Sequence, residues 1–478
     1  MNSVAIIGGG LAGLTTAHRL AQRARESNKL INITLFEAAP RWGGAIRTTK
    51  RENWLIESGA DSFITNRPGG IELCRELGLE SQLIPTDPKF RRSLICHRGR
   101  PVPTPVGFEL MAPRRIGPLL RSPLLTWKGK LRVLAEYFQP GAAPADESVA
   151  SFARRRFGRE AFENIIQPMI GGIYASDPEK LSLAATLPRF LEMERSAGSV
   201  QRAFRRESKG KDKASAEASG ARYGLFVSLR DGMQTLIDAL VESLSAPQSA
   251  VSLRLATPIT VVTRTETGWM VRGPQGADAC FDAVVLTCPT YHVATMLSAD
   301  SAPSADLASL IKELKAIEYS STTIVVTGHE LKDVADPLDA FGLIVPANEH
   351  RRIMAVSFPS RKFPGRAPEG CVQLRTFVGG ALQPELMALD DAQLMALVQD
   401  ELKSLLGVAE PPQFVQITRY QRAMPQYHLG HLARVDRIEQ QLSNIPGLFL
   451  TGIAYRGVGI PDVIQQARTT ADQIVAVA

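Results

Sequence analysis

Cysteine and aromatic residues are scarce in this chain, and it has no long hydrophobic run. Only 5 of its 478 residues are cysteine, and only 6% are aromatic. The cysteines are Cys74, Cys96, Cys280, Cys288 and Cys371, an odd number with wide spacing and no Cys-x-x-Cys pair. This pattern excludes a disulfide framework, favours reduced thiols in the cytoplasm, and gives no reason to expect a metal site. The uncharged stretch 283–299 is too polar to cross a membrane, because it contains a proline, a histidine and threonines.

Charge of one sign is not concentrated either. The 55 lysines and arginines exceed the 48 acidic residues by 7, a mild excess for the length. Without a basic stripe we expect no nucleic-acid partner. Hydrophobic residues make up 44% and charged residues 22% of the chain, which is typical of a globular protein of roughly two to four domains.

A glycine-rich turn follows the first apolar run of the chain. Residues 4–7 predict a buried parallel strand, and an amphipathic helix follows over 14–25. Between them stand Gly8, Gly9, Gly10, Leu11, Ala12 and Gly13, a Gly-x-Gly-x-x-Gly turn. A second strand, 31–36, ends at Glu37, whose carboxylate suits a ribose diol and would repel a 2′-phosphate. The spacing predicts a dinucleotide site in which the turn faces the pyrophosphate and NADP is disfavoured.

The residues after Glu37 distinguish between the possible cofactors. Arg41 and the pair Gly43-Gly44 complete a Glu-x-x-x-Arg-x-Gly-Gly pattern, which resembles the FAD-binding pattern of the amine oxidase and phytoene desaturase superfamily. Near the other end, 450–462 predicts a strand, a glycine turn and the start of a helix. In that superfamily the corresponding segment closes over the flavin ring. The simpler alternative, a strand and helix that only complete the sheet, stays open.

Four internal segments resemble those of the protoporphyrinogen oxidase family, which includes relatives that oxidise coproporphyrinogen III. They are 57–63, 168–177, 228–236 and 425–431, and they occur in the family's order. The chain departs from the family at Ala45, where a basic residue is common, and at Arg230-Asp231-Gly232, where Lys-Gly-Gly or Arg-Gly-Gly is common.

The resemblance implies a set of binding residues and no catalytic side chain. It implies that FAD is bound by Gly8, Gly9, Gly10, Leu11, Ala12, Gly13, Glu37, Arg41, Gly44, Ala45, Ser58, Gly59, Ala60, Asp61, Ile259, Ile453, Val458, Gly459 and Ile460. It implies that the substrate is bound by Arg92, Gly171, Gly172 and Tyr174, with Arg92 on a propionate and Arg91 as the alternative. Because the flavin would take the hydride, we assign no catalytic residue.

The implied activity is oxidation of protoporphyrinogen IX to protoporphyrin IX in haem biosynthesis, with O2 as acceptor and H2O2 as product. The next enzyme of the pathway is an implied partner. Three alternatives stay open: a coproporphyrinogen III oxidase giving coproporphyrin III, another flavin amine oxidase or desaturase of the superfamily, and a non-catalytic protein that binds flavin or porphyrin.

We expect an α/β fold with a discontinuous Rossmann-like FAD domain, a mixed-sheet substrate domain and a helical domain. The expected ranges are 1–52, 223–291 and 415–478 for the FAD domain, 53–88 and 292–414 for the substrate domain, 89–205 for the helical domain, and 206–222 for a flexible loop. Apolar residues at 118–120 and 123–125 lie among cations of the helical domain. Two interpretations stay open: a cytoplasmic protein with exposed arginines, and a peripheral contact with the inner face of the cell membrane.

Overall fold

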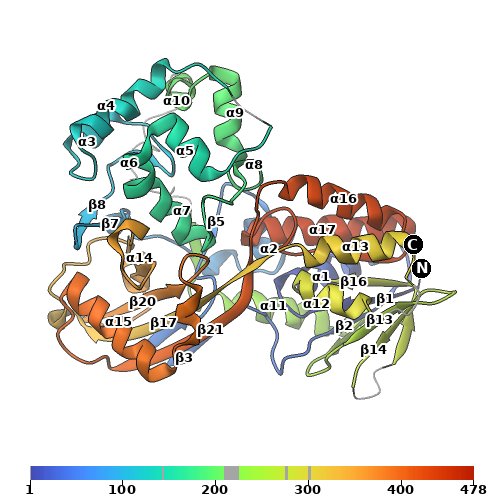
Figure 1. Ribbon diagram of the computed structural model, residues 1–478. Helices are drawn as coiled ribbons and strands as arrows, with labels where there is room; N and C mark the ends of the chain where they lie inside the picture. The colour runs from blue at the N-terminus through green and yellow to red at the C-terminus, as the bar shows by residue number, and fades with distance from the viewer. Residues whose placement is uncertain (1, 143–144, 209–225, 275–277, 300–302) are drawn as a thin grey trace.

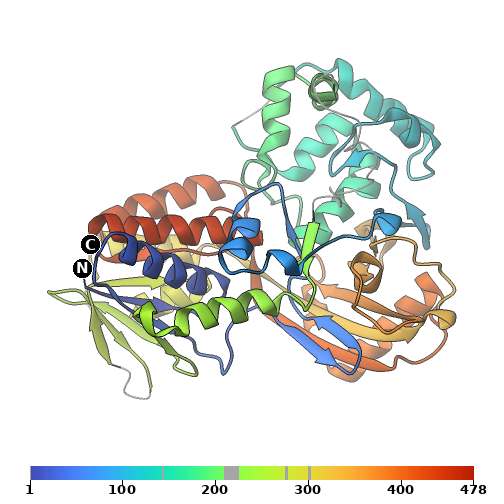
Figure 2. The ribbon, with the colours of Figure 1, turned by 180° about the vertical axis from the view of Figure 1, so that it is seen from behind.

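The computed structural model describes residues 2–142, 145–208, 226–274, 278–299 and 303–478. Figures 1 and 2 show a helical region above two sheet-containing regions that lie side by side. Both chain termini lie at the outer end of one of these regions. The α/β fold class is confirmed, and so is the assembly of one region from both ends of the chain.

A five-stranded parallel sheet joins the two chain ends. Its order is β12 (Val251–Arg254), β2 (Asn32–Phe36), β1 (Ser3–Ile7), β16 (Ala283–Leu286) and β22 (Leu448–Leu450). Val4 and Ile6 pack on one face with α1 (Leu11–Glu26), α11 (Gln234–Ser245) and α17 (Ile460–Val477). Ala5 and Ile7 pack on the other face with α12 (Thr290–Leu297), α13 (Ala305–Lys315) and α16 (His431–Ser443). The run 4–7 is apolar throughout because both of its faces are buried.

A seven-stranded mixed sheet forms the second region. Its order is β21 (Phe414–Pro425), β17 (Tyr319–Glu330), β20 (Cys371–Gly379), β19 (Ala355–Ser357), β18 (Gly342–Ile344), β7 (Leu94–His97) and β8 (Arg100–Pro103). Only the β18–β7 pair is parallel among these described strands. Helix α15 (Asp391–Leu406) packs with one face of the sheet. The hairpin of β3 (Thr48–Arg51) and β4 (Trp54–Glu57) places Trp54 and Ile56 against β17 and Phe414.

The helical region contains a buried charge network beside its apolar core. Its helices are α3 (Ile116–Arg121), α4 (Trp127–Ala135), α5 (Val149–Phe157), α6 (Arg159–Ala161), α7 (Gln167–Tyr174), α8 (Leu183–Thr186), α9 (Pro188–Ala197) and α10 (Val200–Ser208). Arg156 is buried and pairs with Glu136 and, at 3.2 Å, with Glu194. Glu136 also accepts hydrogen bonds from the backbone N–H groups of Val200 (2.9 Å) and Gln201 (3.1 Å). One carboxylate therefore neutralises Arg156 and caps α10.

The division into three domains remains a proposal, and strand pairing corrects two of its boundaries. Strands β7 and β8 fall within 89–205, and β21 falls within 415–478 except for its first residue, Phe414, yet all three belong to the seven-stranded sheet. The prolines of β8 made the sequence read as a loop at this strand. They are tolerated because β8 is an edge strand, where a missing N–H leaves no ladder bond unmade.

The loop expected at 206–222 is also corrected in part. Residues 206–208 form the last turn of α10, and residues 209–222 lie outside the described residues. In the described ranges we find no helix that has both the length and the apolar character needed to cross a bilayer.

Candidate active site

The first glycine turn is closed by its own backbone. Gly8 adopts a φ of +113°, and a Cβ on Gly13 would lie 1.9 Å from the carbonyl oxygen of Gly8. The Thr287 hydroxyl donates to the carbonyls of Ile7 and Gly8, both at 3.0 Å. Only glycine fits at 8 and 13, because any side chain would displace the turn from the start of α1.

Gly10 differs from its neighbours because space remains beside it. Leaving aside the two chain neighbours, the one atom of the described residues within 4 Å of a Cβ placed there is Gly44 Cα, at 3.9 Å. The chain passes close on one side, since the Gly43 N–H donates to the Gly9 carbonyl at 2.8 Å. The second glycine of the motif therefore keeps open the position where a pyrophosphate can approach the helix N-terminus.

Glu37 joins the turn to the end of β2. Its carboxylate accepts from the N–H groups of Gly9 (2.6 Å) and Ala39 (2.7 Å). Its own carbonyl accepts from the Thr257 N–H at 2.8 Å, which brings the loop containing Ile259 beside it. The structure thus places the loop that contains Ile259 next to Glu37, and the contact of both residues with the adenosine half of FAD remains a prediction.

Arg41 contacts backbone carbonyls of its own turn. Its guanidinium donates to the carbonyls of Trp42 (3.2 Å), Ile46 (3.1 Å) and Gly44. Its role as a charge beside the phosphates remains a prediction. The structure adds that Arg41 closes the 41–46 turn. The Trp42 ring packs against the backbone of Gly9, because a Cβ there would lie 2.4 Å from the ring.

The second glycine turn reaches the same edge of the sheet. After β22 the chain passes through Gly452 and Gly457, both with positive φ, and Gly459 caps α17. Val458 packs against the core of the helical region, whereas Ile453 and Ile460 belong to the core of the five-stranded sheet. Because β1, β16 and β22 are parallel, the residues after all three meet at one edge.

These features fit FAD. Two hydroxyls at that edge, Thr290 Oγ1 after β16 and Thr451 Oγ1 after β22, are buried and have no hydrogen-bond partner among the described residues. A polar ligand would satisfy such groups, whose burial otherwise costs free energy. Together with the opening at Gly10, the N-terminus of α1 and the carboxylate of Glu37, they form a donor and acceptor set suited to a dinucleotide.

The segment 58–61 is anchored by the seven-stranded sheet. A Cβ on Gly59 would lie 1.8 Å from the Ala45 carbonyl, so these two stretches touch backbone to backbone. Arg375 of β20 donates to the Gly59 carbonyl, and Gln416 of β21 donates to Ser58 Oγ at 2.8 Å. Sequence reasoning missed Arg375 and Gln416, because they lie more than 300 residues away and match no motif.

Asp61 is engaged by protein side chains. Lys362 Nζ donates to its two carboxylate oxygens at 3.0 and 3.1 Å. Burial raises the pKa of Asp61, but the charges of Lys362 and Arg375 outweigh burial, so this pKa lies well below its usual range. Glu57, four residues earlier, shows the opposite result, because burial raises its pKa to about 7. A direct contact of Asp61 with FAD remains a prediction, while its ion pair with Lys362 ties this segment to α14 (Pro359–Lys362), which contacts β20.

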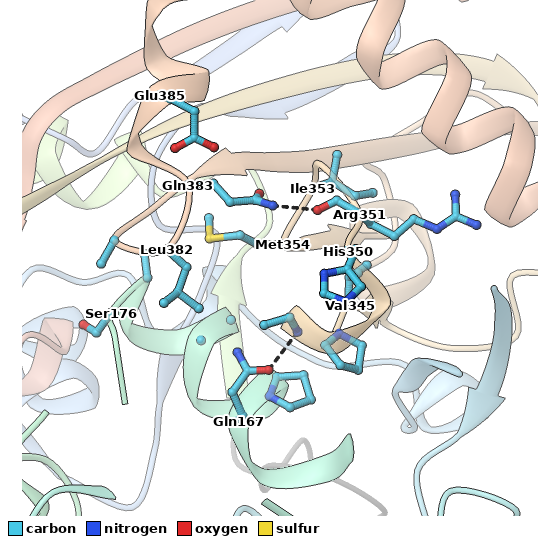
Figure 3. Close-up of a pocket in the computed structure, with 17 residues that line it drawn as sticks. Gln167, Ser176, Val345, His350, Arg351, Ile353, Met354, Leu382, Gln383 and Glu385 are labelled. Carbon is cyan, nitrogen blue, oxygen red and sulfur yellow. Dashed lines mark hydrogen bonds between the residues drawn. The ribbon is translucent and has the colours of Figure 1, made fainter. Parts of the chain in front are cut away.

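A cavity of about 350 Å³ lies beside α7. Gly171 and Gly172 line it, and outside α7 a Cβ on Gly172 would meet only Ile344 among the described residues, at 3.8 Å. Figure 3 shows Gln167 below the cavity, Gln383 and Met354 above it, and Arg351 pointing away from it. Sequence reasoning missed the walls formed by residues 345–354 and 381–385, which belong to loops without a recognisable motif.

The other two predicted substrate residues lie outside this lining. The Tyr174 hydroxyl donates to the Thr186 carbonyl at 3.2 Å. Arg92 Nη2 pairs with Asp339 Oδ2 at 2.6 Å, and Arg92 Nε donates to the Asp339 carbonyl at 2.7 Å. Arg91 donates to the Thr86 carbonyl at 3.0 Å. A substrate carboxylate would therefore have to compete with Asp339 for Arg92.

A parallel sheet with glycine turns from both chain ends and a glutamate after its second strand defines an FAD-dependent oxidoreductase. The chain belongs to the flavin containing amine oxidoreductase family, whose pattern matches residues 11–475. FAD is its cofactor, as expected.

Individual relatives match over nearly the whole chain. A coproporphyrinogen III oxidase of Bacillus subtilis (strain 168) is 31% identical over 470 residues, which cover 97% of this chain and 96% of the relative. Protoporphyrinogen oxidase 2 of Arabidopsis thaliana is 28% identical, covering 99% and 94%. A crystal structure from Exiguobacterium sp. 255-15, provisionally assigned as a protoporphyrinogen oxidase, superposes with a TM-score of 0.87 at 28% identity, covering 100% and 99%. The resemblance to the protoporphyrinogen oxidase family is confirmed.

Proposed function

We propose that this protein oxidises a porphyrinogen to the corresponding porphyrin, a step of haem biosynthesis, with O2 as final acceptor and H2O2 as product. The observation that carries the proposal is the position of the cavity. It is lined by Gly171 and Gly172 of α7, while Tyr174 of the same helix and Val458 of the second glycine turn pack against one hydrophobic cluster. A macrocycle bound along α7 would lie beside the cofactor.

The protein's contribution is to bind, orient and desolvate the substrate. FAD, when bound, supplies the hydride acceptor for a methylene bridge flanked by two pyrroles. The side chains of Val345, Ile353, Met354 and Leu382 give the cavity apolar walls, which suit a large apolar macrocycle. The glycines of α7 leave room for the ring to approach the helix backbone, so that orientation can replace a catalytic side chain.

Two substrates are candidates. Protoporphyrinogen IX is the first, as the sequence resemblance implies. Coproporphyrinogen III is the second, and the relatives named as its oxidases favour it, since the Bacillus subtilis enzyme is 31% identical whereas the Arabidopsis enzyme is 28% identical. Coproporphyrinogen III carries two propionates in place of two vinyl groups, so its preference would require cations around the cavity. Arg351 and His350 lie at the cavity, although the Arg351 guanidinium pairs with Glu401 at 3.0 Å.

Parallel assays under air with the two porphyrinogens test the proposal. We expect porphyrin fluorescence to rise above the autoxidation rate with at least one of them, together with stoichiometric H2O2. The ratio of the two kcat/KM values identifies the preferred substrate. A yellow, folded protein that accelerates neither reaction would refute the proposal and favour a non-catalytic flavin- or porphyrin-binding protein.

Arg92→Ala tests the propionate contact. We expect KM to rise roughly fivefold with a smaller change in kcat, because a half-exposed charge pair contributes about 1 kcal/mol and acts equally on ground and transition states. Asp339→Asn is the matched variant. It releases Arg92 Nη2 and is expected to lower KM in steady-state kinetics. An unchanged KM in Arg92→Ala would contradict the assignment of Arg92 to a substrate propionate.

We also propose a peripheral membrane contact, on a different surface from the one that the sequence indicated. Leu119 and Leu124, in the apolar pieces expected to face lipid, are fully buried. Instead Trp127, Leu131 and Phe138 are 69%, 63% and 82% exposed along α4 and the turn that follows it. Trp127 and Leu131 are four residues apart and so share one face of α4, and Phe138 ends the short 3-10 turn that follows. Exposed aromatic and leucine side chains of this kind suit a lipid interface.

Replacing Trp127, Leu131 and Phe138 together by serine tests this contact. We expect binding to anionic phospholipid vesicles to weaken about tenfold or more in a sedimentation assay, because apolar area drives interfacial insertion. Leu30→Ser is the control, since Leu30 is 91% exposed but lies in the turn between α1 and β2. If the triple variant binds vesicles as well as the unmodified protein does, or if the unmodified protein does not bind them, the proposed membrane contact is wrong. These three side chains are then simply exposed to solvent.

A further inference from the structure

The segment Pro425–His431 contacts three parts of the molecule. On the side of the seven-stranded sheet, the Gln426 N–H donates to the Glu318 carbonyl at 2.9 Å. On the helical side, the Tyr427 carbonyl accepts from the Ser182 N–H at 2.8 Å, and the Leu429 N–H donates to the Lys180 carbonyl at 2.9 Å. Its third contact is with the second glycine turn of the cofactor site, and neither the flavin nor the substrate assignment has so far given this segment a role.

The Tyr427 hydroxyl closes the loop that leads into α17. It donates to the Ile453 carbonyl at 2.5 Å and accepts from the Gly457 N–H at 2.9 Å. One oxygen therefore joins the two ends of a five-residue stretch that has no helix or strand of its own. Gly457 has a φ of +126°, so its N–H is directed by a backbone conformation that few residues adopt. Val458 and Gly459 follow directly, and α17 begins at Ile460.

His431 supports Tyr427 from behind. The two rings are stacked, with centroids 4.0 Å apart and an interplanar angle of 12°. His431 is fully buried, and its Nε2 lies 2.9 Å from the Tyr455 carbonyl, to which it donates. Burial lowers the pKa of His431 to about 4, so the ring is neutral near pH 7 and its one proton is used on this carbonyl. The same loop is thus held at 453, 455 and 457 from the Pro425–His431 segment.

We propose that Tyr427, supported by His431, is a positioning residue that sets the conformation of loop 453–459 against FAD. The loop begins at the carboxyl edge of the parallel sheet, where the cofactor fits, so its shape decides how closely its backbone can approach the flavin. The same tyrosine bonds to Ser182 and packs in the core of the helical region, so the cofactor loop is tied to the region that supplies α7. The inference rests on the proposed place of FAD and does not depend on the porphyrinogen.

Tyr427→Phe tests the inference, because it removes both hydroxyl hydrogen bonds and keeps the ring and its stacking. The Ile453 carbonyl and the Gly457 N–H both lose this hydrogen-bond partner, and we expect FAD affinity to weaken about tenfold. We measure the Kd by titrating the apoprotein with FAD, and we expect a shifted flavin absorption spectrum and faster amide hydrogen exchange at Gly457. If a porphyrinogen is oxidised, the additional kinetic signature with saturating FAD is a lower kcat at nearly constant KM.

Two further variants keep the test decisive. Tyr137→Phe is the control, since its hydroxyl accepts a hydrogen bond from Arg205 Nη1, at 3.1 Å, on the surface of the helical region, and it should leave the FAD Kd unchanged. His431→Gln removes the stacked ring and retains a donor for Tyr455, and it should weaken FAD about threefold. If Tyr427→Phe fails to fold, the FAD affinity of His431→Gln tests the inference instead. Wild-type FAD affinity and spectrum in Tyr427→Phe, or in His431→Gln where only that variant folds, would overturn the inference.

The two proposals can fail separately. If neither porphyrinogen is oxidised but Tyr427→Phe still weakens FAD binding, the positioning role stands and the proposed function falls. If a porphyrinogen is oxidised and Tyr427→Phe binds FAD as the unmodified protein does, the reverse holds.

Discussion

Gly10→Ala is expected to give a folded protein that purifies without colour. Among the described residues beyond its chain neighbours, a Cβ at this position meets only Gly44 Cα, at 3.9 Å, and the backbone of Gly10, with a φ of −77°, accepts any residue. The protein therefore tolerates the methyl group, whereas a pyrophosphate packed against this backbone does not. We expect the FAD Kd to rise about 100-fold or more, equivalent to about 2.7 kcal/mol, with an unchanged thermal midpoint of the apoprotein. Absorbance near 450 nm and titration of the apoprotein measure the effect.

Gly13→Ala provides the contrast. Its Cβ would lie 1.9 Å from the Gly8 carbonyl, so the variant must distort the turn and is expected to lose stability as well as FAD. Circular dichroism melting of the two apoproteins separates the cases. Retention of FAD by Gly10→Ala with wild-type affinity would show that the cofactor does not pass this turn, and the site would have to be placed elsewhere.

Lys362→Met is expected to produce the largest loss of stability. Lys362 Nζ contacts both oxygens of Asp61 and also Ser62 Oγ, at 2.8 Å, and little of either charged side chain is exposed. Without the ammonium group, the nearest cation is Arg375, 4.0 Å from Asp61 Oδ2. Removing one partner of a buried pair costs about 3–5 kcal/mol, because the buried carboxylate loses its direct countercharge and only the more distant Arg375 remains. Chemical denaturation near pH 7 measures this change.

The pH dependence gives an independent check on the Asp61 pair. Because the pKa of Asp61 is lower in the folded state, its pairing stabilises the protein above its unfolded pKa of about 4, and this stability is lost as the pH falls toward the folded value. In Lys362→Met this acid-dependent loss should be smaller, since less pairing energy remains to lose. The double variant Asp61→Asn, Lys362→Met should recover most of the stability at pH 7. If Lys362→Met is as stable as the unmodified protein, the inference that Lys362 compensates the buried charge of Asp61 is wrong.

The cofactor class was readable in the sequence because it depends on local backbone geometry. A strand, a turn that requires glycine at 8 and 13, a helix and an acidic residue at 37 lie within one short stretch. Their order and spacing fix the position of the turn relative to the strand and helix, whatever surrounds them. The second turn, around Gly459, was readable for the same reason. The parallel sheet followed, since a run such as 4–7, apolar on both faces, has few other places to be buried.

The contacts around this site depend on packing between distant segments. Asp61 lies 301 residues from Lys362, and Arg92 lies 247 residues from Asp339, so no local pattern records either pair. The solvent exposure of a side chain also depends on packing between distant segments. Leu124 and Trp127 are neighbours in an apolar stretch, yet the first is fully buried and the second is 69% exposed. Dihedral preferences act within a few residues and could be read directly, whereas partner choice and burial are settled only when the sheets and helices close on one another.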